Sequence, residues 1–274
     1  MLICFFVLCL HNKNLKKLYM KGLYIIQIVL LSLFFLSCAE EGVTQGSVTA
    51  RVQVIHNSAD LAAQSVDIYL NNDLLLDNFS FRTASPFVDV PAGEEITIGV
   101  APSTSMSASQ SIVSYSYNLT EDKKYVLIAS GHISPFGYTP LKNFSVEVCD
   151  MGRENASNAS NTDLLVFHGA TDAPTVDVVE TGVGAGTIVN NMSYKDFTSY
   201  LELSTANYTI DIRDESGLNT VATYQAPLSN LNLMGGAGVV VASGFLNPSN
   251  NSNGEAFGLF VALPSGGDLV ALPN

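Results

Sequence analysis

The sequence has no tryptophan, few charged residues and only four cysteines in 274 residues. Charged residues make up 14% of the chain, whereas an average soluble domain has about 25%. Because 47% of the residues are hydrophobic, the composition excludes disorder driven by charge, and the chain is expected to fold. The 12 basic residues are outnumbered by 25 acidic ones, which gives a net charge of −13. This acidity excludes nucleic acid as a partner.

The N-terminal part of the sequence has the charge and hydropathy pattern of a signal peptide. Its charged residues up to position 37 are all lysines, and an uncharged apolar segment covers residues 22–36. Fifteen residues suit a signal-peptide core better than a membrane-spanning helix of about 20. The segment ends at Ser37-Cys38, which resembles the lipobox of bacterial lipoproteins. We therefore predict that residues 1–37 are removed and that Cys38 is lipidated. Met20 also opens a complete signal peptide, so a start at Met1 or at Met20 stays open.

Removal of the leader changes the charge and the cysteine count of the mature chain. From Cys38 onward the chain keeps all 25 acidic residues and eight basic ones, for a net charge of −17. With Cys38 lipidated, Cys149 has no partner, so hydrophobic cores rather than disulfides must hold the fold. Glu40 and Glu41 resemble the acidic signals that send some lipoproteins to the outer face of the outer membrane. We expect a surface-exposed outer-membrane lipoprotein with a flexible tether over residues 38–47.

A stretch of the sequence occurs twice at a nearly constant offset. VQVIHNSADLAAQSVDIYL (52–70) recurs as LLVFHGATDAPTVDVV (164–179). The matched pairs are His56 with His168, Asp60 with Asp172, and Asp67 with Asp177. The polar segment 151–163 separates the copies. The sequence therefore predicts two tandem domains, 48–152 and 162–274, joined by a linker over 153–161.

Apolar and polar residues alternate with a period of two in both copies, which is typical of half-buried β-strands. Val52, Val54 and His56 share one face of the first strand, and Arg51 and Gln53 share the other. Turn residues recur at short intervals, and no part of the mature chain has a sustained helical period. We predict an all-β protein with two tandem antiparallel β-sandwich domains of immunoglobulin-like architecture. The pattern leaves the strand order open.

Both copies carry the same opening motif, ARVQVIHNSAD with SVDIYL in the first and LLVFHGATDAP with TVDVV in the second. This motif resembles the bacterial family called domain of unknown function 4397. The first copy departs from it at Asp60-Leu61-Ala62, and the second has Ser204-Thr205-Ala206 in place of the Pro-Ala-Gly turn. The resemblance implies exported, cell-envelope proteins with tandem domains, and it implies no activity.

The repeated histidine and aspartate are the strongest candidates for catalysis, since a carboxylate can orient an imidazole as a general base. Strand parity places His56 and His168 at the rim of a core, where a ring nitrogen can bind backbone of the following turn while Asp60 or Asp172 caps that turn. No serine or cysteine nucleophile recurs in register with them. We therefore predict a structural motif and no catalytic residues. A hydrolase that uses the His/Asp pair stays the alternative.

The sequence predicts no metal site and no cofactor. The acidic stretch 211–215 lacks the spacing of a calcium loop, and the histidines lack zinc spacing. For a ligand, Tyr138 in SPFGYTP is the best candidate for an exposed aromatic ring, and the polar loops 103–111 and 248–254 offer a binding surface. We expect a non-enzymatic module that binds an envelope protein or a polysaccharide, attached to the membrane through its lipid. A pure structural spacer is the remaining alternative.

Overall fold

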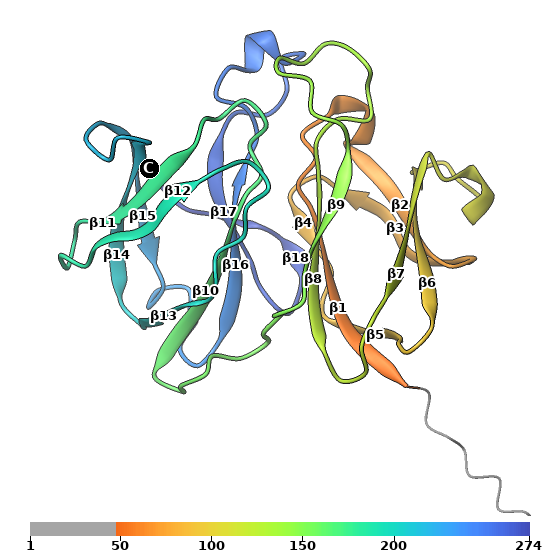
Figure 1. The fold of residues 1–274 in the computed structure, drawn as a ribbon, viewed down its shortest axis with the longest axis horizontal. Helices are drawn as coiled ribbons and strands as arrows, with labels where there is room; N and C mark the ends of the chain where they lie inside the picture. Colours follow the sequence, from red (N-terminus) through yellow and green to blue (C-terminus); the bar gives the residue numbers. More distant parts are fainter. Residues whose placement is uncertain (1–47) are drawn as a thin grey trace, which may run out of the picture. The chain divides into compact units, whose positions relative to one another are not determined.

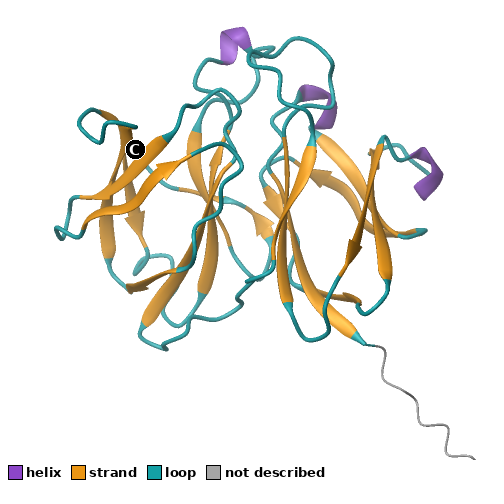
Figure 2. Cartoon of the chain, in the orientation of Figure 1, coloured by secondary structure: helices purple, strands orange, loops and turns teal. Residues whose placement is uncertain are grey.

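The computed structural model describes residues 48–274, which are built almost wholly of β-strands (Figure 1, Figure 2). The predicted signal peptide, the lipidated Cys38 and the tether fall at or before residue 47, outside the described residues. Three short 3-10 helices interrupt the strands of the described part: η2 (Leu61–Ala63), η3 (Ala108–Gln110) and η4 (Pro248–Asn250). No helix within residues 48–274 is long and apolar enough to span a membrane.

The first copy folds into two facing sheets. One sheet has the order β18-β4-β1-β8-β9, with β5 also paired to β1, and the other has the order β3-β2-β6-β7. The strands of this copy are β1 (Thr49–His56), β2 (Ser65–Leu70), β3 (Asp73–Ser80), β4 (Thr83–Ala84), β5 (Val88–Pro91), β6 (Glu95–Pro102), β7 (Val113–Asn118), β8 (Lys124–Ser130) and β9 (Ser145–Cys149). The strand β18 in the first sheet comes from the C-terminal end of the chain.

The second copy repeats this arrangement, with sheets in the orders β13-β10-β16-β17-β19 and β12-β11-β14-β15. Its strands are β10 (Asn161–His168), β11 (Val176–Glu180), β12 (Gly186–Met192), β13 (Leu201–Ser204), β14 (Asn207–Asp214), β15 (Thr220–Pro227), β16 (Ala237–Ser243), β17 (Gly258–Ala262), β18 (Gly267–Asp268) and β19 (Val270–Ala271). The all-β sandwich prediction is confirmed. Two pairs, β1 with β8 and β10 with β16, are parallel, a detail that the alternation of side chains does not encode.

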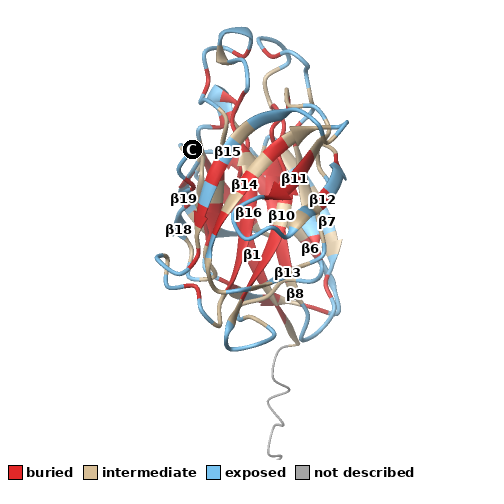
Figure 3. Ribbon diagram, turned by 90° about the vertical axis from the view of Figure 1, so that its left-hand side faces the viewer, coloured by how far each residue is buried: buried red, intermediate tan, exposed pale blue. Residues whose placement is uncertain are grey.

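Three hydrophobic cores hold the described chain together, and their buried residues are among those coloured red in Figure 3. Two of them lie inside the sandwiches, and the third is formed by the outer faces of the β1 and β10 sheets, with Ile55 and Ile128 from the first copy and Phe167 and Val241 from the second. Residues 47–274 form a single compact unit. Because all three cores lie within it, we expect this unit to fold on its own.

Strand β1 was expected to be half-buried, but it is buried on both faces over most of its length. Val54 points into the first core, and Ile55, on the opposite face, points into the third core. Gln53 is buried beside Ile55, where its side-chain amide donates to the carbonyls of Ser85 and Leu263. Gln53 was expected on a polar outer face, and that expectation is wrong because the second copy covers the face and accepts its hydrogen bond.

The segment predicted as a linker carries ion pairs to both copies. Glu154 pairs with Arg51 and Lys124 of the first copy, each at 2.8 Å. Arg153 pairs with Asp163 and Glu202 of the second copy. Asp163 is fully buried and the other partners are partly exposed. Together these ion pairs attach the connection to both sandwiches.

Candidate functional site

The two repeated histidines end β1 and β10 and are buried. Nε2 of His56 lies 2.6 Å from the carbonyl oxygen of Ala63, and the Ser58 N–H donates to Nδ1. This pattern fits a neutral ring that carries its proton on Nε2. Burial lowers the pKa of His56 to about 4, although the bond to Ala63 opposes this shift. His168 has the matching contact, with Nε2 3.0 Å from the carbonyl oxygen of Pro174, and burial lowers its pKa as well.

The low pKa of His56 predicts a loss of stability in acid. An unfolded histidine titrates near 6.5, so between pH 6.5 and about 4 the unfolded chain binds a proton that the folded chain does not. The free energy of unfolding should therefore fall by roughly 3 kcal/mol from this group over that range, and no further below it. Urea denaturation of the wild type and of His56→Gln at pH 7 and pH 4 measures this. Equal losses in both proteins would contradict the assignment.

The repeated aspartates of the same motifs hold long loops in place. Asp60 accepts hydrogen bonds from the N–H of Ala62 at 2.9 Å, from the N–H and Oγ of Ser134 at 2.6 and 2.8 Å, and from the hydroxyl of Tyr138 at 2.8 Å. Burial alone would raise the pKa of Asp60, but these bonds outweigh it and lower the pKa. Asp172 accepts from the N–H groups of Leu246 and Asn247. Each carboxylate thus anchors a long loop of its own copy. Asp60 anchors the loop 131–144 after β8, and Asp172 anchors the loop 244–257 after β16.

The His/Asp pair that would be needed for a hydrolase is not assembled in the described chain. Neither His56 nor His168 hydrogen-bonds the aspartate of its own motif within residues 48–274, because the imidazoles contact backbone and the carboxylates contact the loops. Within residues 48–274, neither motif therefore contains an imidazole oriented by a carboxylate.

The last repeated pair, Asp67 and Asp177, stabilises a bulge beside the strand that carries it. Their carboxylates accept from the N–H groups of Asn78 at 3.0 Å and Asn191 at 2.7 Å. Both asparagines have a φ of 52°, in the left-handed region that asparagine tolerates better than most residues. The register of each strand pair shifts at this point. The aspartate thus supports the extra residue in the neighbouring strand.

The two long loops meet at one end of the sandwiches (Figure 1). The ring of Tyr138 stacks on His132 with centroids 4.1 Å apart, and it also contacts Phe245 of the second copy at 5.6 Å. The N–H of Thr139 donates to Oδ1 of Asn251, and the Ser252 hydroxyl donates to the carbonyl of Gly137. We call residues 57–64, 131–144 and 244–257 the loop platform.

Tyr138 was expected to be exposed, and that expectation is wrong. Only 7% of Tyr138 is accessible to solvent, because its hydroxyl bonds Asp60 while its ring lies in the stack. The neighbouring Phe136 is 80% exposed instead, and Leu61, Leu141 and Leu246 of the platform are also exposed. Phe136 and Tyr138 lie in the same SPFGYTP segment. Because this segment is an irregular loop, the pattern of its residues does not indicate which of the two rings is buried. The ligand role that was predicted for Tyr138 stays untested.

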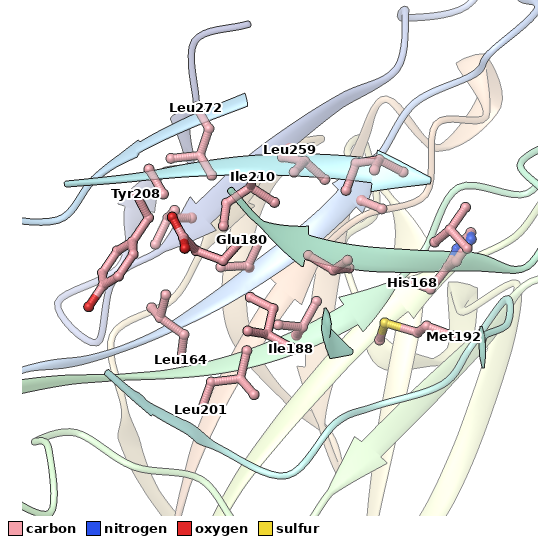
Figure 4. Close-up of a pocket in the computed structure, with 18 of the residues that line it drawn as sticks. Leu164, His168, Glu180, Ile188, Met192, Leu201, Tyr208, Ile210, Leu259 and Leu272 are labelled. Atoms are coloured by element: carbon pink, nitrogen blue, oxygen red, sulfur yellow. The ribbon is translucent and has the colours of Figure 1, made fainter. Parts of the chain in front are cut away.

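An apolar cavity of about 90 Å³ lies between the two sheets of the second sandwich (Figure 4). Its walls include Leu164 and Leu201 on one sheet and Ile188, Met192 and Ile210 on the other. Sequence reasoning missed this cavity, because the residues that line it are typical of an ordinary core. Within residues 48–274, no group of three or more His, Cys, Asp or Glu side chains is placed to hold a metal ion.

The fold and these motifs define a tandem pair of β-sandwiches, each opened by a His–Asp motif that braces its loops. A family model described as "Domain of unknown function (DUF4397)" matches residues 50–153 and 162–247. The chain belongs to this family and contains two copies of its domain. The family match ends inside the loop after β16, while the second sandwich continues through β17 to β19.

Some solved structures share a limited similarity with the chain. One, "Alpha-glucan binding by a streptococcal virulence factor", is 9% identical, with 70% of this chain and 92% of that chain covered and a TM-score of 0.23. A putative adhesin from Bacteroides ovatus is 9% identical, with 82% and 95% covered and a TM-score of 0.22. No curated protein matches the sequence. At this level of similarity the activities of those proteins do not transfer to this chain.

Proposed function

We propose that this protein is a lipid-anchored, non-enzymatic lipoprotein of the outer membrane, whose loop platform binds a protein partner at the cell surface. The observation that carries the proposal is the set of exposed apolar side chains on the platform: Leu61, Phe136, Leu141 and Leu246. Apolar side chains gathered on loops at one end of a rigid scaffold are typical of interaction sites. Strand β1 begins at the opposite end, so attachment through residues before Thr49 leaves the platform free.

A protein partner fits the platform better than a polysaccharide. Sugar-binding surfaces need aromatic faces on which a pyranose ring can stack, but His132, Tyr138 and Phe245 stack on one another and are buried. Phe136 is left as an isolated exposed ring among leucines. Protein interfaces are enriched in phenylalanine and use such apolar anchors at their centres.

The anchor is tested with the full-length chain expressed in its own host. Cys38→Ala should move the protein from the membrane fraction to the soluble fraction, because the acyl chains supply the attachment. Cys9→Ala is the matched control, since this cysteine lies in the predicted leader, and it should leave the protein in the membrane. Membrane retention of the Cys38→Ala protein would refute the lipid anchor.

The platform is tested by placing a photo-reactive amino acid at Phe136 or Leu246 of the full-length protein in intact cells. We expect a discrete crosslinked protein product at both positions, which disappears when Phe136→Ser is combined with the probe at Leu246. The control position is Met151, which is also exposed but follows β9 at the end opposite the platform. Products that stain as polysaccharide, or an equal yield at Met151, would overturn the protein-partner proposal.

A further inference from the structure

The cavity of the second sandwich has an almost wholly apolar wall. It lies between sheets β13-β10-β16-β17-β19 and β12-β11-β14-β15, and leucine, isoleucine, valine and methionine side chains from both sheets face it (Figure 4). Ile188 and Leu201, on the edge strands β12 and β13, are only half-buried. The cavity wall is therefore partly exposed to solvent at these two edge strands.

The cores of the two copies differ at two matched strand pairs that lie beside the cavity. In the first copy Tyr117 pairs with Ile96, and in the second copy Ala226 pairs with the matching residue, Tyr208. Phe79, which pairs with Val66, is matched in the same way by Met192. Phe79 is part of the first core and Tyr117 packs against it, while Ala226 and Met192 line the cavity. The second core thus has a flexible methionine where the first has the ring of Phe79. At the other pair the ring changes strand, because Tyr208 replaces Ile96 while Ala226 replaces Tyr117.

The polar groups in the cavity wall determine which charge a ligand of the cavity can carry. The Glu180 carboxylate is buried and accepts from the N–H groups of Gly182, Val183 and Ala185 at 2.7 to 3.0 Å. Burial would raise the pKa of Glu180, but these amide bonds lower it, so the carboxylate stays ionised. This charge would repel an anionic ligand. Within the described residues, Nδ1 of His168 is buried without a hydrogen-bond partner.

We propose that the second sandwich binds one small, uncharged, mainly hydrocarbon molecule between its sheets. An apolar cavity stays dry and takes up apolar guests, as an engineered protein cavity of about 150 Å³ does with benzene and xenon. The present cavity, at about 90 Å³, accommodates xenon or a short alkyl chain. A single hydroxyl on the guest is compatible with the free Nδ1 acceptor of His168. This site shares only Phe257 with the loop platform, and it does not depend on the proposed anchor or on the platform's partner.

The test uses residues 47–274 with labelled isoleucine and leucine methyl groups, observed by NMR. Xenon and 1-pentanol should each give saturable shifts at Ile188 and Leu201 of the second sandwich, and none at Ile96 of the first. Pentanoate has the same chain length but a negative charge, and it should bind at least tenfold more weakly. No saturable shift with xenon, shifts centred on Ile96, or equal binding of pentanoate would overturn the proposal.

Filling the cavity tests its location. Met192→Phe introduces the residue that occupies the matching position in the first copy, and it should weaken 1-pentanol binding at least tenfold. Ile188→Phe, on the half-buried edge strand, is the second filling variant and should have the same effect if Met192→Phe does not fold. Met106→Phe is the matched control, because Met106 is exposed on a loop of the first copy, and its binding should be unchanged. Unweakened binding in a folded filling variant would refute the site.

Discussion

Replacing Phe167 with alanine is expected to lower the free energy of unfolding of residues 47–274 by about 3–5 kcal/mol. Phe167 is fully buried in the third core, and its ring lies 4.7 Å from that of Phe197. Removing the ring leaves a cavity where the two copies meet, in contact with the Ile55 and Ile128 side of the first copy. Chemical denaturation followed by circular dichroism measures the change.

The same experiment tests whether the third core couples the two copies. Because they share this core, the wild type should unfold in one transition, and the variant should lose stability in both copies together. Phe136→Ala is the matched control, since the exposed Phe136 side chain should change stability by no more than about 0.5 kcal/mol. Two separate transitions in the wild type, or a variant that destabilises the second copy alone, would contradict a shared core.

Ending the chain at Pro264 is expected to destabilise both copies by about 3–6 kcal/mol in total. The deletion removes Leu269 from the third core and Leu272 from the second, and each buried leucine contributes about 1.5–3 kcal/mol. It also removes β18, which pairs with β4 of the first copy, and the bond from the N–H of Leu269 to the carbonyl of Arg82.

Methyl NMR of the truncated protein separates this effect from simple fraying of the C-terminus. Perturbed signals should appear at Ala84 and Ile55 in the first copy as well as at Leu259 in the second. Deleting only Pro273 and Asn274 is the control, and it should retain the third core because Leu269 remains. A truncated protein whose first copy keeps wild-type signals and stability would contradict the structural role of β18.

Much of the fold could be predicted from local pattern, and the remainder depends on how the copies pack. The period of two located the strands, and the offset between His56 and His168 revealed the tandem copies. The burial of Gln53 could not be predicted, because its carbonyl partner on Leu263 lies 210 residues away. The parallel direction of β1 and β8 was equally hidden, since side-chain alternation is the same for both directions.

The candidate sites show the same division. The repeat singled out Asp60 and Asp172, but their loop partners lie 74 residues further along the chain in both copies. A short motif carries no information about such distant contacts, so Asp60 was assigned only to its own turn. The inward rotation of Tyr138 depends on Asp60 and on Phe245 of the other copy. The cavity wall differs from the first core at Met192, which matches Phe79, and only the strand register makes this match visible.

The pairing of β18 with β4 also has a consequence for the order in which the molecule forms. Synthesis proceeds from the N-terminus, so the first sandwich emerges long before the residues that complete its sheet. Until Gly267 and Asp268 are available, β4 has an unpaired edge and Ile55 and Ile128 lack their cover. Contacts that close such long loops form slowly, and exposed strand edges favour aggregation. Folding is therefore completed late. The partly synthesised chain needs protection from aggregation until Gly267 and Asp268 have been added.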